Sequence, residues 1–238
     1  VDAERSALFP NGVNLREIRP LSDRGGWRDR QKIPRDAFLV LYSGSMGEKQ
    51  GLELLLEAAR MLSSDGRIFF VLCGEGSARE RLLSASHGLN NVRFLPLQPA
   101  SELNAMLNAA DLHVLPQLAE AEDLVMPSKL GPILASGGAT VATARPGTQI
   151  ATAVTEAGGV VIPPGDASCL AAAIRDAAQN PARLEAAKRK AREYAESHLN
   201  DEAIYDGYFK LIRDSVSAAA SKRQQQKSES AHVQKCVS

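Results

Sequence analysis

The sequence has few aromatic residues and lacks an excess of either charge. Its 238 residues contain 28 Lys and Arg against 28 Asp and Glu, so its global charge does not point to nucleic acid or to another strongly charged partner. Aromatic residues make up only 5% and are not clustered with basic ones, which argues against a platform for stacked bases. Nucleic acid is therefore not an expected partner.

The three cysteines form neither a disulfide framework nor a metal site. Cys73, Cys169 and Cys236 are odd in number and far apart, and no Cys-x-x-Cys or Cys/His spacing is present. We interpret Cys73 and Cys169 as small buried residues in a reducing compartment. No apolar run approaches the roughly 20 residues that span a bilayer, and no signal peptide is recognisable. We therefore expect a cytoplasmic protein without a bound metal.

What the sequence does contain is a regular alternation of strand and helix. The expected strands span residues 38–43, 68–73, 92–95, 112–115, 139–144 and 159–162. They are apolar on both faces, which is typical of a parallel sheet covered by helices on both sides. Right-handed crossovers then predict an α/β fold with a doubly wound, Rossmann-like, six-stranded sheet of order 3-2-1-4-5-6. A ligand would bind at the carboxyl ends of its strands.

Changes in composition along the chain predict its domain organisation. Residues 1–36 are expected to be an irregular entry segment, with a polar surface loop over residues 22–35, and residues 37–199 to form the sheet domain. Residues 200–217 carry apolar side chains at helical spacing, and this stripe needs either its own sheet or another domain to cover it. Residues 218–238 are polar and are expected to be disordered.

The stretch from Asp123 to Gly137, between the fourth and fifth strands, has the features of a phosphate site. Pro127 fits the first turn of a helix that Ser128 can cap, and Lys129 adds a cation at the same end. Free backbone N–H groups and the helix dipole favour an anion there. Gly137 is expected to end the helix at a positive φ. An ordinary strand–helix–strand crossover would show the same pattern.

A second candidate is the loop from Gly44 to Gly51, which follows the first strand. Its glycine spacing is not that of G-x-G-x-x-G, and it is not a P-loop, since Lys49 is followed by Gln50. Backbone N–H groups, the Ser45 hydroxyl and the Lys49 ammonium would together clamp a diphosphate without a metal. The alternative is that Lys49 is a solvated lysine in the first turn of a helix.

Three further features have both a structural and a functional interpretation. We favour the Gly-Glu-Gly segment at residues 74–76 as a tight turn between strand and helix. We favour His113 as a hydrogen-bonded core histidine over a catalytic base. The acidic cluster of Glu120, Glu122 and Asp123 would either contact sugar hydroxyls or form a solvated loop face.

Five segments carry a resemblance to a known family. They read F-P-N-G-V-N, L-Y-S-G-S-M-G-E-K-Q-G-L, L-C-G-E-G, A-A-D-L-H-V-L-P and M-P-S-K-L-x-x-x-L-A-S-G. In this order they resemble the carboxyl-terminal, donor-binding half of a retaining glycosyltransferase of family 4, of the exopolysaccharide (colanic-acid-like) type. The resemblance covers residues 9–216.

The resemblance implies a GT-B architecture, in which two Rossmann-like domains face each other across a cleft that holds a nucleoside-diphosphate sugar. It implies transfer of a hexose to a saccharide or lipid-linked acceptor without a metal or another cofactor. An amino-terminal acceptor domain or a partner chain would complete the cleft, and the last amphipathic helix would cross back to it. Peripheral association with the inner face of the membrane is an open alternative to a freely cytoplasmic protein.

The resemblance also implies roles for individual residues. The residues implied in binding the donor diphosphate are Gly44, Ser45, Lys49, Pro127, Ser128 and Lys129. Those implied in contacting the base are Phe94, Leu95, Leu97 and Gln98. Glu122 or Asp123 would contact the sugar. Lys49 and Lys129 would stabilise the leaving diphosphate, while no catalytic acid or base is identified.

The sequence departs from the family pattern in three respects. Many members carry a Glu-x7-Glu pair whose positions fall here on Leu124 and Pro132, and many carry an Arg where Ser45 stands. The third departure is that about half of the expected chain is missing, because an acceptor domain normally precedes a segment such as residues 1–10. Transfer needs both substrates in a closed, dry cleft, so we expect this part alone to transfer sugar poorly. Two alternatives stay open. One is a truncated, non-catalytic module that binds a nucleotide or a partner, and the other is a sugar-nucleotide epimerase, for which no acid/base set is found.

Overall fold

The computed structural model describes residues 11–117 and 128–217. Its parallel strands form one six-stranded sheet in the order β3-β2-β1-β4-β5-β6. The strands are β1 (Phe38–Ser43), β2 (Ile68–Cys73), β3 (Val92–Leu95), β4 (Leu112–Leu115), β5 (Thr140–Thr143) and β6 (Val160–Ile162). The predicted fold class and strand order are therefore confirmed. Because the order reverses between β1 and β4, the carboxyl ends of these two strands mark the switch point of the sheet.

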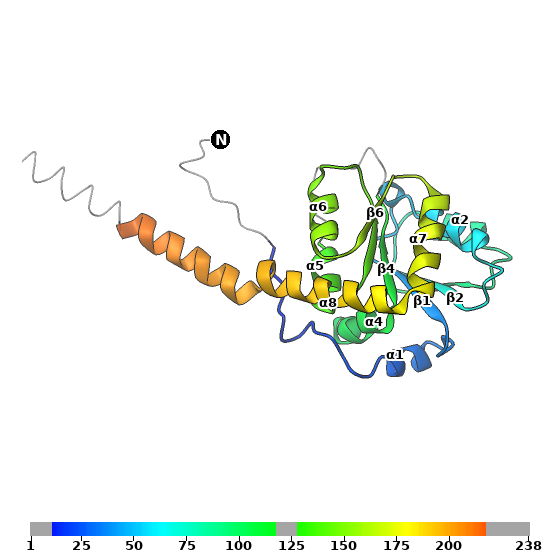
Figure 1. Cartoon of the computed structure of the whole chain (residues 1–238), viewed down its shortest axis with the longest axis horizontal. Helices are drawn as coiled ribbons and strands as arrows, with labels where there is room; N and C mark the ends of the chain where they lie inside the picture. Colours follow the sequence, from blue (N-terminus) through cyan, green and yellow to red (C-terminus); the bar gives the residue numbers. More distant parts are fainter. Residues whose placement is uncertain (1–10, 118–127, 218–238) are drawn as a thin grey trace, which may run out of the picture.

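Helices cover both faces of the sheet (Figure 1). They are α1 (Gly25–Arg30), α2 (Glu53–Met61), α3 (Arg79–Ala85), α4 (Leu103–Ala109), α5 (Leu130–Ala135), α6 (Gln149–Glu156), α7 (Ala167–Gln179) and α8 (Pro181–His198). Two short 3-10 helices, η2 (Glu48–Gln50) and η3 (Ala100–Glu102), precede α2 and α4. One face packs against α2, α3 and α7, and the other against α1, α4, α5 and α6.

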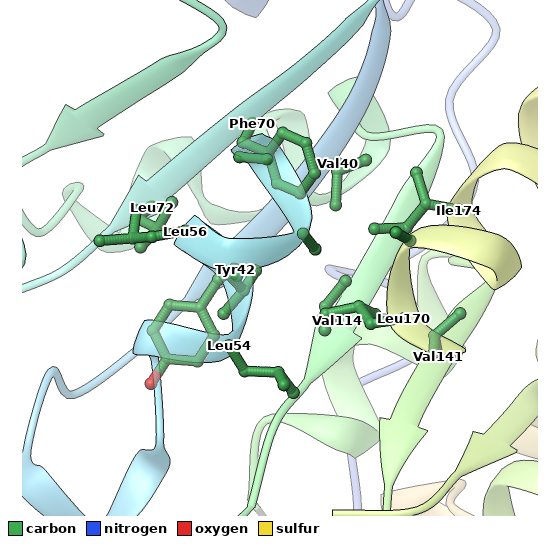
Figure 2. Packing of buried hydrophobic residues seen from close by; sticks show 14 of the residues in the cluster. Val40, Tyr42, Leu54, Leu56, Phe70, Leu72, Val114, Val141, Leu170 and Ile174 are labelled. Atoms are coloured by element: carbon green, nitrogen blue, oxygen red, sulfur yellow. The ribbon is translucent and has the colours of Figure 1, made fainter. Parts of the chain in front are cut away.

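The alternation of side chains along β1 shows why the central strands are apolar throughout. Val40 and Tyr42 point into one core cluster, while Leu39 and Leu41 point into the cluster on the opposite face. In Figure 2, Val40 and Tyr42 lie near side chains of β2, β4, α2 and α7, with the Tyr42 hydroxyl at the margin of the cluster. A strand that is buried on both faces therefore carries a nearly continuous run of apolar residues.

The prediction of an irregular surface loop over residues 22–35 is wrong for α1. Trp27 is only 1% exposed and belongs to the core cluster beneath β1 and β2. Arg28 is also buried, with its guanidinium 2.7 Å from the Asp111 carboxylate and hydrogen-bonded to the carbonyl oxygens of Ala37 and Ala109. The polar composition was misleading because the partners of Arg28 on α4 and beside β4 are about 80 residues away in the sequence.

The chain continues after α8 as a helix over residues 201–217, which extends away from the sheet domain (Figure 1). Tyr205, Phe209 and Val216 in this helix are 58%, 60% and 64% exposed. The interpretation that its apolar stripe packs on its own sheet is therefore wrong, while coverage by another domain stays a prediction. None of the helices in the described ranges is long and apolar enough to cross a membrane. The predicted disorder of residues 218–238 concerns a part of the chain outside the described residues.

Candidate functional site

The loops that follow β1 and β2 are bonded to each other through their backbones. The N–H of Gly44 donates to the carbonyl of Cys73 at 2.9 Å, and the N–H of Met46 donates to that of Glu75 at 2.8 Å. A Cβ added at Gly76 would lie 2.5 Å from the carbonyl oxygen of Met46, and Gly76 has a φ of +154°. Only glycine fits such a close approach and such a φ. The structural interpretation of residues 74–76 as a tight turn is therefore confirmed.

Lys129 reaches from the start of α5 to the loop after β1. Its Nζ donates a hydrogen bond of 3.0 Å to the hydroxyl of Tyr42 and lies 4.4 Å from the centroid of the Tyr42 ring. The Tyr42 hydroxyl in turn donates to the carbonyl oxygen of Ser45. Gly44 leaves room for the ammonium, since an added Cβ there would lie 2.7 Å from Nζ. Two candidate segments that are distant in the sequence therefore meet at the switch point of the sheet.

The ammonium of Lys129 is held there at an electrostatic cost. Its side chain is half-buried, and burial lowers its pKa to about 8. Over residues 11–117 and 128–217, no carboxylate forms an ion pair with it. Burial raises the pKa of Tyr42, so its hydroxyl stays protonated and neutral. A partly desolvated cation without a counter-ion favours a bound anion, and the geometry can therefore hold an anionic group.

Ser45 and Lys49 both have exposed side chains in the same loop region. Lys49 lies in η2, and within the described ranges it forms no ion pair. The neighbouring Glu48 instead pairs with Arg81, which also contacts Glu53. Among the described carboxylates, none therefore compensates the charge of Lys49 beside the loop. Its role as a diphosphate ligand stays a prediction, as does the alternative of a solvated lysine.

The helix expected at Pro127 begins later than predicted. α5 starts at Leu130, its N-cap residue is Lys129, and no side chain caps it, so the capping role of Ser128 is wrong. Lys129 already has helical backbone angles as the N-cap residue. Ser128 lies one residue before it and is exposed. Pro127 lies outside the described residues. The predicted end is confirmed, because Gly137 has a φ of +73°.

The segment expected to contact a base presents few free side chains. Phe94 packs against one core cluster, and Leu95 is buried in the cluster on the opposite face. Leu97 is 69% exposed, and Gln98 is held by a hydrogen bond of 2.9 Å from its side-chain amide to the carbonyl of Pro96. The side chains of Phe94 and Leu95 are therefore committed to the core. A ligand at this position would meet backbone groups and Leu97.

The acidic residues predicted to contact a sugar, Glu122 and Asp123, lie outside the described residues, together with Glu120. Their roles stay predictions. His113 is described, and it is buried with its Nε2 3.1 Å from the carbonyl oxygen of Leu107. Burial lowers the pKa of its imidazole to about 4. The interpretation of His113 as a core histidine is confirmed.

Sequence reasoning missed Tyr42 as a member of this site. The sequence places Tyr42 only within the buried strand at residues 38–43, because its neighbours are apolar. The signal that could have found it is the hydroxyl at the carboxyl end of β1, next to the glycine loop. A buried phenol needs a hydrogen-bond partner, and here the partners come from the loop and from Lys129.

The family model described as glycosyl transferases group 1 matches residues 23–195. The chain is 35% identical over 219 residues to WcaI of Escherichia coli (strain K12), which is named as a colanic acid biosynthesis glycosyl transferase. This match covers 90% of the chain and 53% of WcaI, so the chain spans about half the length of this relative.

Solved structures show the same fold. Sucrose-phosphate synthase from Thermosynechococcus elongatus matches with a TM-score of 0.73 and 26% identity, over 89% of this chain and 53% of that one. Anabaena HepE in complex with UDP and glucose matches with a TM-score of 0.75 and 17% identity, over 89% of this chain and 58% of that one. The match to the family model extends over most of the sheet domain described above. The chain belongs to the glycosyl transferases group 1 family.

Proposed function

We propose that this chain is the donor-binding domain of a glycosyltransferase that moves a hexose from a nucleoside-diphosphate sugar to a saccharide or lipid-linked acceptor. The observation that carries the proposal is the half-buried ammonium of Lys129, which lies against Gly44 at the switch point without a carboxylate partner among the described residues. Open α/β sheets bind their ligands at this position. A diphosphate would supply a negative charge that no carboxylate of residues 11–117 and 128–217 supplies to Lys129.

The chemistry proposed for the site is electrostatic. When the bond between sugar and diphosphate breaks, negative charge grows on the leaving diphosphate. Lys129 would neutralise part of this charge, Lys49 would add a second cation, and backbone N–H groups of loop 44–51 would donate hydrogen bonds. Two cations and a glycine loop take the place that a metal ion fills in other transferases, so we propose a metal-independent and cofactor-independent reaction. Retention of the anomeric configuration belongs to the same proposal.

Two of the similar proteins support this function. WcaI is named for colanic acid biosynthesis, and the HepE structure contains UDP and glucose. Because the chain spans about half the length of WcaI, we propose that the acceptor is bound by an amino-terminal domain or a partner chain. The exposed apolar side chains of residues 201–217 are consistent with coverage by that part. We propose a cytoplasmic location, with the inner membrane face as the site of lipid-linked acceptors.

The proposal is tested by titrating the chain with UDP, GDP, ADP and dTDP, using calorimetry and thermal unfolding in the presence of EDTA. We expect one nucleotide to raise the Tm selectively, since a ligand at 100 times its Kd stabilises by about 2.7 kcal/mol. Lys129→Met should weaken that binding about tenfold or more, because it removes a charge-assisted bond. Lys210→Met, in the exposed helix 201–217, is the matched control and should bind as the wild type does.

Three results would contradict all or part of the proposal. A flat response to all four nucleotides, both in EDTA and in a parallel titration with Mg²⁺, would mean that this chain does not hold the donor. Equal affinities of Lys129→Met and Lys210→Met would mean that the anion binds elsewhere. A response that requires Mg²⁺ and disappears in EDTA would overturn metal independence while leaving donor binding intact.

A second candidate is a module that binds the nucleotide but does not transfer sugar. It is favoured by Pro132, which lies in α5 at a position where many family members carry a Glu. The two candidates separate in an assay that supplies this chain with the proposed acceptor-binding domain and follows a labelled sugar. Nucleotide binding without transfer in that assay would favour the module.

A further inference from the structure

Tyr42 connects three parts of the candidate site through one hydroxyl group. The residue is fully buried in β1, yet its oxygen lies at the carboxyl end of the strand, where it accepts from Lys129 Nζ and donates to the carbonyl of Ser45. We propose that Tyr42 is a positioning residue for the donor: it holds the Lys129 ammonium against loop 44–51, so that cation and loop form one preformed diphosphate site. This inference rests on the proposed donor-binding function.

The hydrogen-bond polarity of the network supports this role. A phenol has one O–H to donate and lone pairs that accept. Since the O–H points to the Ser45 carbonyl, the oxygen is left to accept from the ammonium. The ring adds a second contact, because Nζ lies 4.4 Å from its centroid and a cation is attracted to the face of an aromatic ring. The bond to Ser45 fixes the phenol on the loop, and the phenol in turn orients the side chain of the lysine.

A lysine in this position needs such support. Its four-carbon stem is flexible, and its ammonium is strongly hydrated in water. Over the described residues no carboxylate forms an ion pair with it, and the phenol is the side chain that its ammonium bonds there. An ammonium has three N–H donors, and one bond to Tyr42 leaves the others for a ligand. Because the cation is already held in place before binding, less conformational entropy is lost when the ligand binds.

The competing explanation is that Tyr42 only fills space. Its ring belongs to the same core cluster as Leu54 and Leu72, near which it lies in Figure 2, and packing in that cluster alone would account for burial. Packing does not require a hydroxyl, however, and Phe would fill the same volume. Tyr42→Phe therefore separates the two explanations, since it keeps the ring and removes both hydrogen bonds.

The experiment is a double-mutant cycle with Tyr42→Phe, Lys129→Met and the two combined. Kd is measured by calorimetry for whichever of UDP, GDP, ADP and dTDP binds the wild type most tightly. Tyr205→Phe, on the exposed helix 201–217, is the control for the chemical change. We expect Tyr42→Phe to weaken binding about fivefold to tenfold and Tyr205→Phe to leave it unchanged. The double variant should bind no more weakly than Lys129→Met, because Tyr42 acts through Lys129.

The outcomes distinguish this inference from the function on which it rests. If Lys129→Met loses affinity while Tyr42→Phe binds as the wild type does, donor binding stands and the positioning role is overturned. If the two single effects add in the double variant, Tyr42 acts independently of Lys129 and the inference is also overturned. If the wild type binds none of the four nucleotides, the donor-binding function fails and the inference fails with it. Thermal unfolding of each variant verifies that the protein measured is folded.

Discussion

Gly74 and Gly44 lie so close that a Cβ added at Gly74 would overlap the carbonyl oxygen of Gly44. Both residues have φ values that L side chains rarely adopt, +149° and +141°. Their contact joins the loops after β1 and β2 backbone to backbone at the switch-point edge of the sheet. The position of Gly44, and hence of the Lys129 ammonium beside it, depends on this contact.

Gly74→Ala should therefore destabilise the protein by about 3 kcal/mol, through steric overlap and an unfavourable φ. Gly66→Ala is the control, because a Cβ at Gly66 meets no atom within 4 Å. That control should change stability by no more than about 0.5 kcal/mol. Urea denaturation of the three proteins measures both values. Equal stabilities of the two variants would refute the close contact.

Deprotonation of Lys129 should raise the free energy of unfolding at alkaline pH. The folded pKa of about 8 lies below the unfolded value of about 10.4, so the folded state releases the proton first. The cost of burying the charge is present below pH 8 and is relieved as pH rises toward 10.4, by up to about 3 kcal/mol. Denaturation of wild type and Lys210→Met between pH 7 and 10 should show this component, and Lys129→Met should lack it. Burial raises the pKa of Cys73 to about 11, so its titration lowers stability as pH rises. This contribution is the same in every variant and cancels when their profiles are compared.

Donor affinity should fall in the same pH range. Above pH 8 the free protein holds Lys129 increasingly neutral, while a bound diphosphate favours the charged form. The association constant of the bound nucleotide should therefore fall by up to about tenfold per pH unit until the Lys129 pKa of the complex is reached. The last phosphate ionisation, near pH 6, is complete in this range. Calorimetry at pH 7, 8 and 9 measures the decline, and an affinity that stayed constant would exclude titration of Lys129 in binding.

His113 should make the protein sensitive to acid. Its folded pKa of about 4 lies below the unfolded value of about 6.5, so the unfolded state takes up the proton first as pH falls. Stability contributed by the neutral imidazole is present above pH 6.5 and is lost toward pH 4, by about 3 kcal/mol. His113→Gln should flatten this part of the pH profile in denaturation experiments. The exposed His87 provides the control His87→Gln, which should retain the wild-type profile.

The α1 region shows where sequence reasoning failed. The six strands could be predicted from their apolar runs, because a strand that is buried on both faces is apolar throughout. Their order could be predicted from the handedness of the crossovers. The polar segment around α1 carried no such local signal. Trp27 and Arg28 are buried because α4 and Asp111 lie beside them in the folded chain. Composition describes an average environment, whereas burial of an individual arginine depends on partners that only folding brings close.

The order of amino acids was enough to predict the parallel doubly wound sheet and the edge of that sheet at which a ligand is expected to bind. Both follow from the periodicity of apolar residues and the handedness of crossovers, which are local rules. The family was recognised from the resemblance of five short segments instead. The tertiary structure then established the contact of Lys129 with Tyr42, which lies 87 residues earlier in the chain. It also decided that Ser128 does not cap α5 and that residues 201–217 leave the sheet domain. Such contacts depend on loop paths and side-chain directions, which are set by the packing of the whole domain.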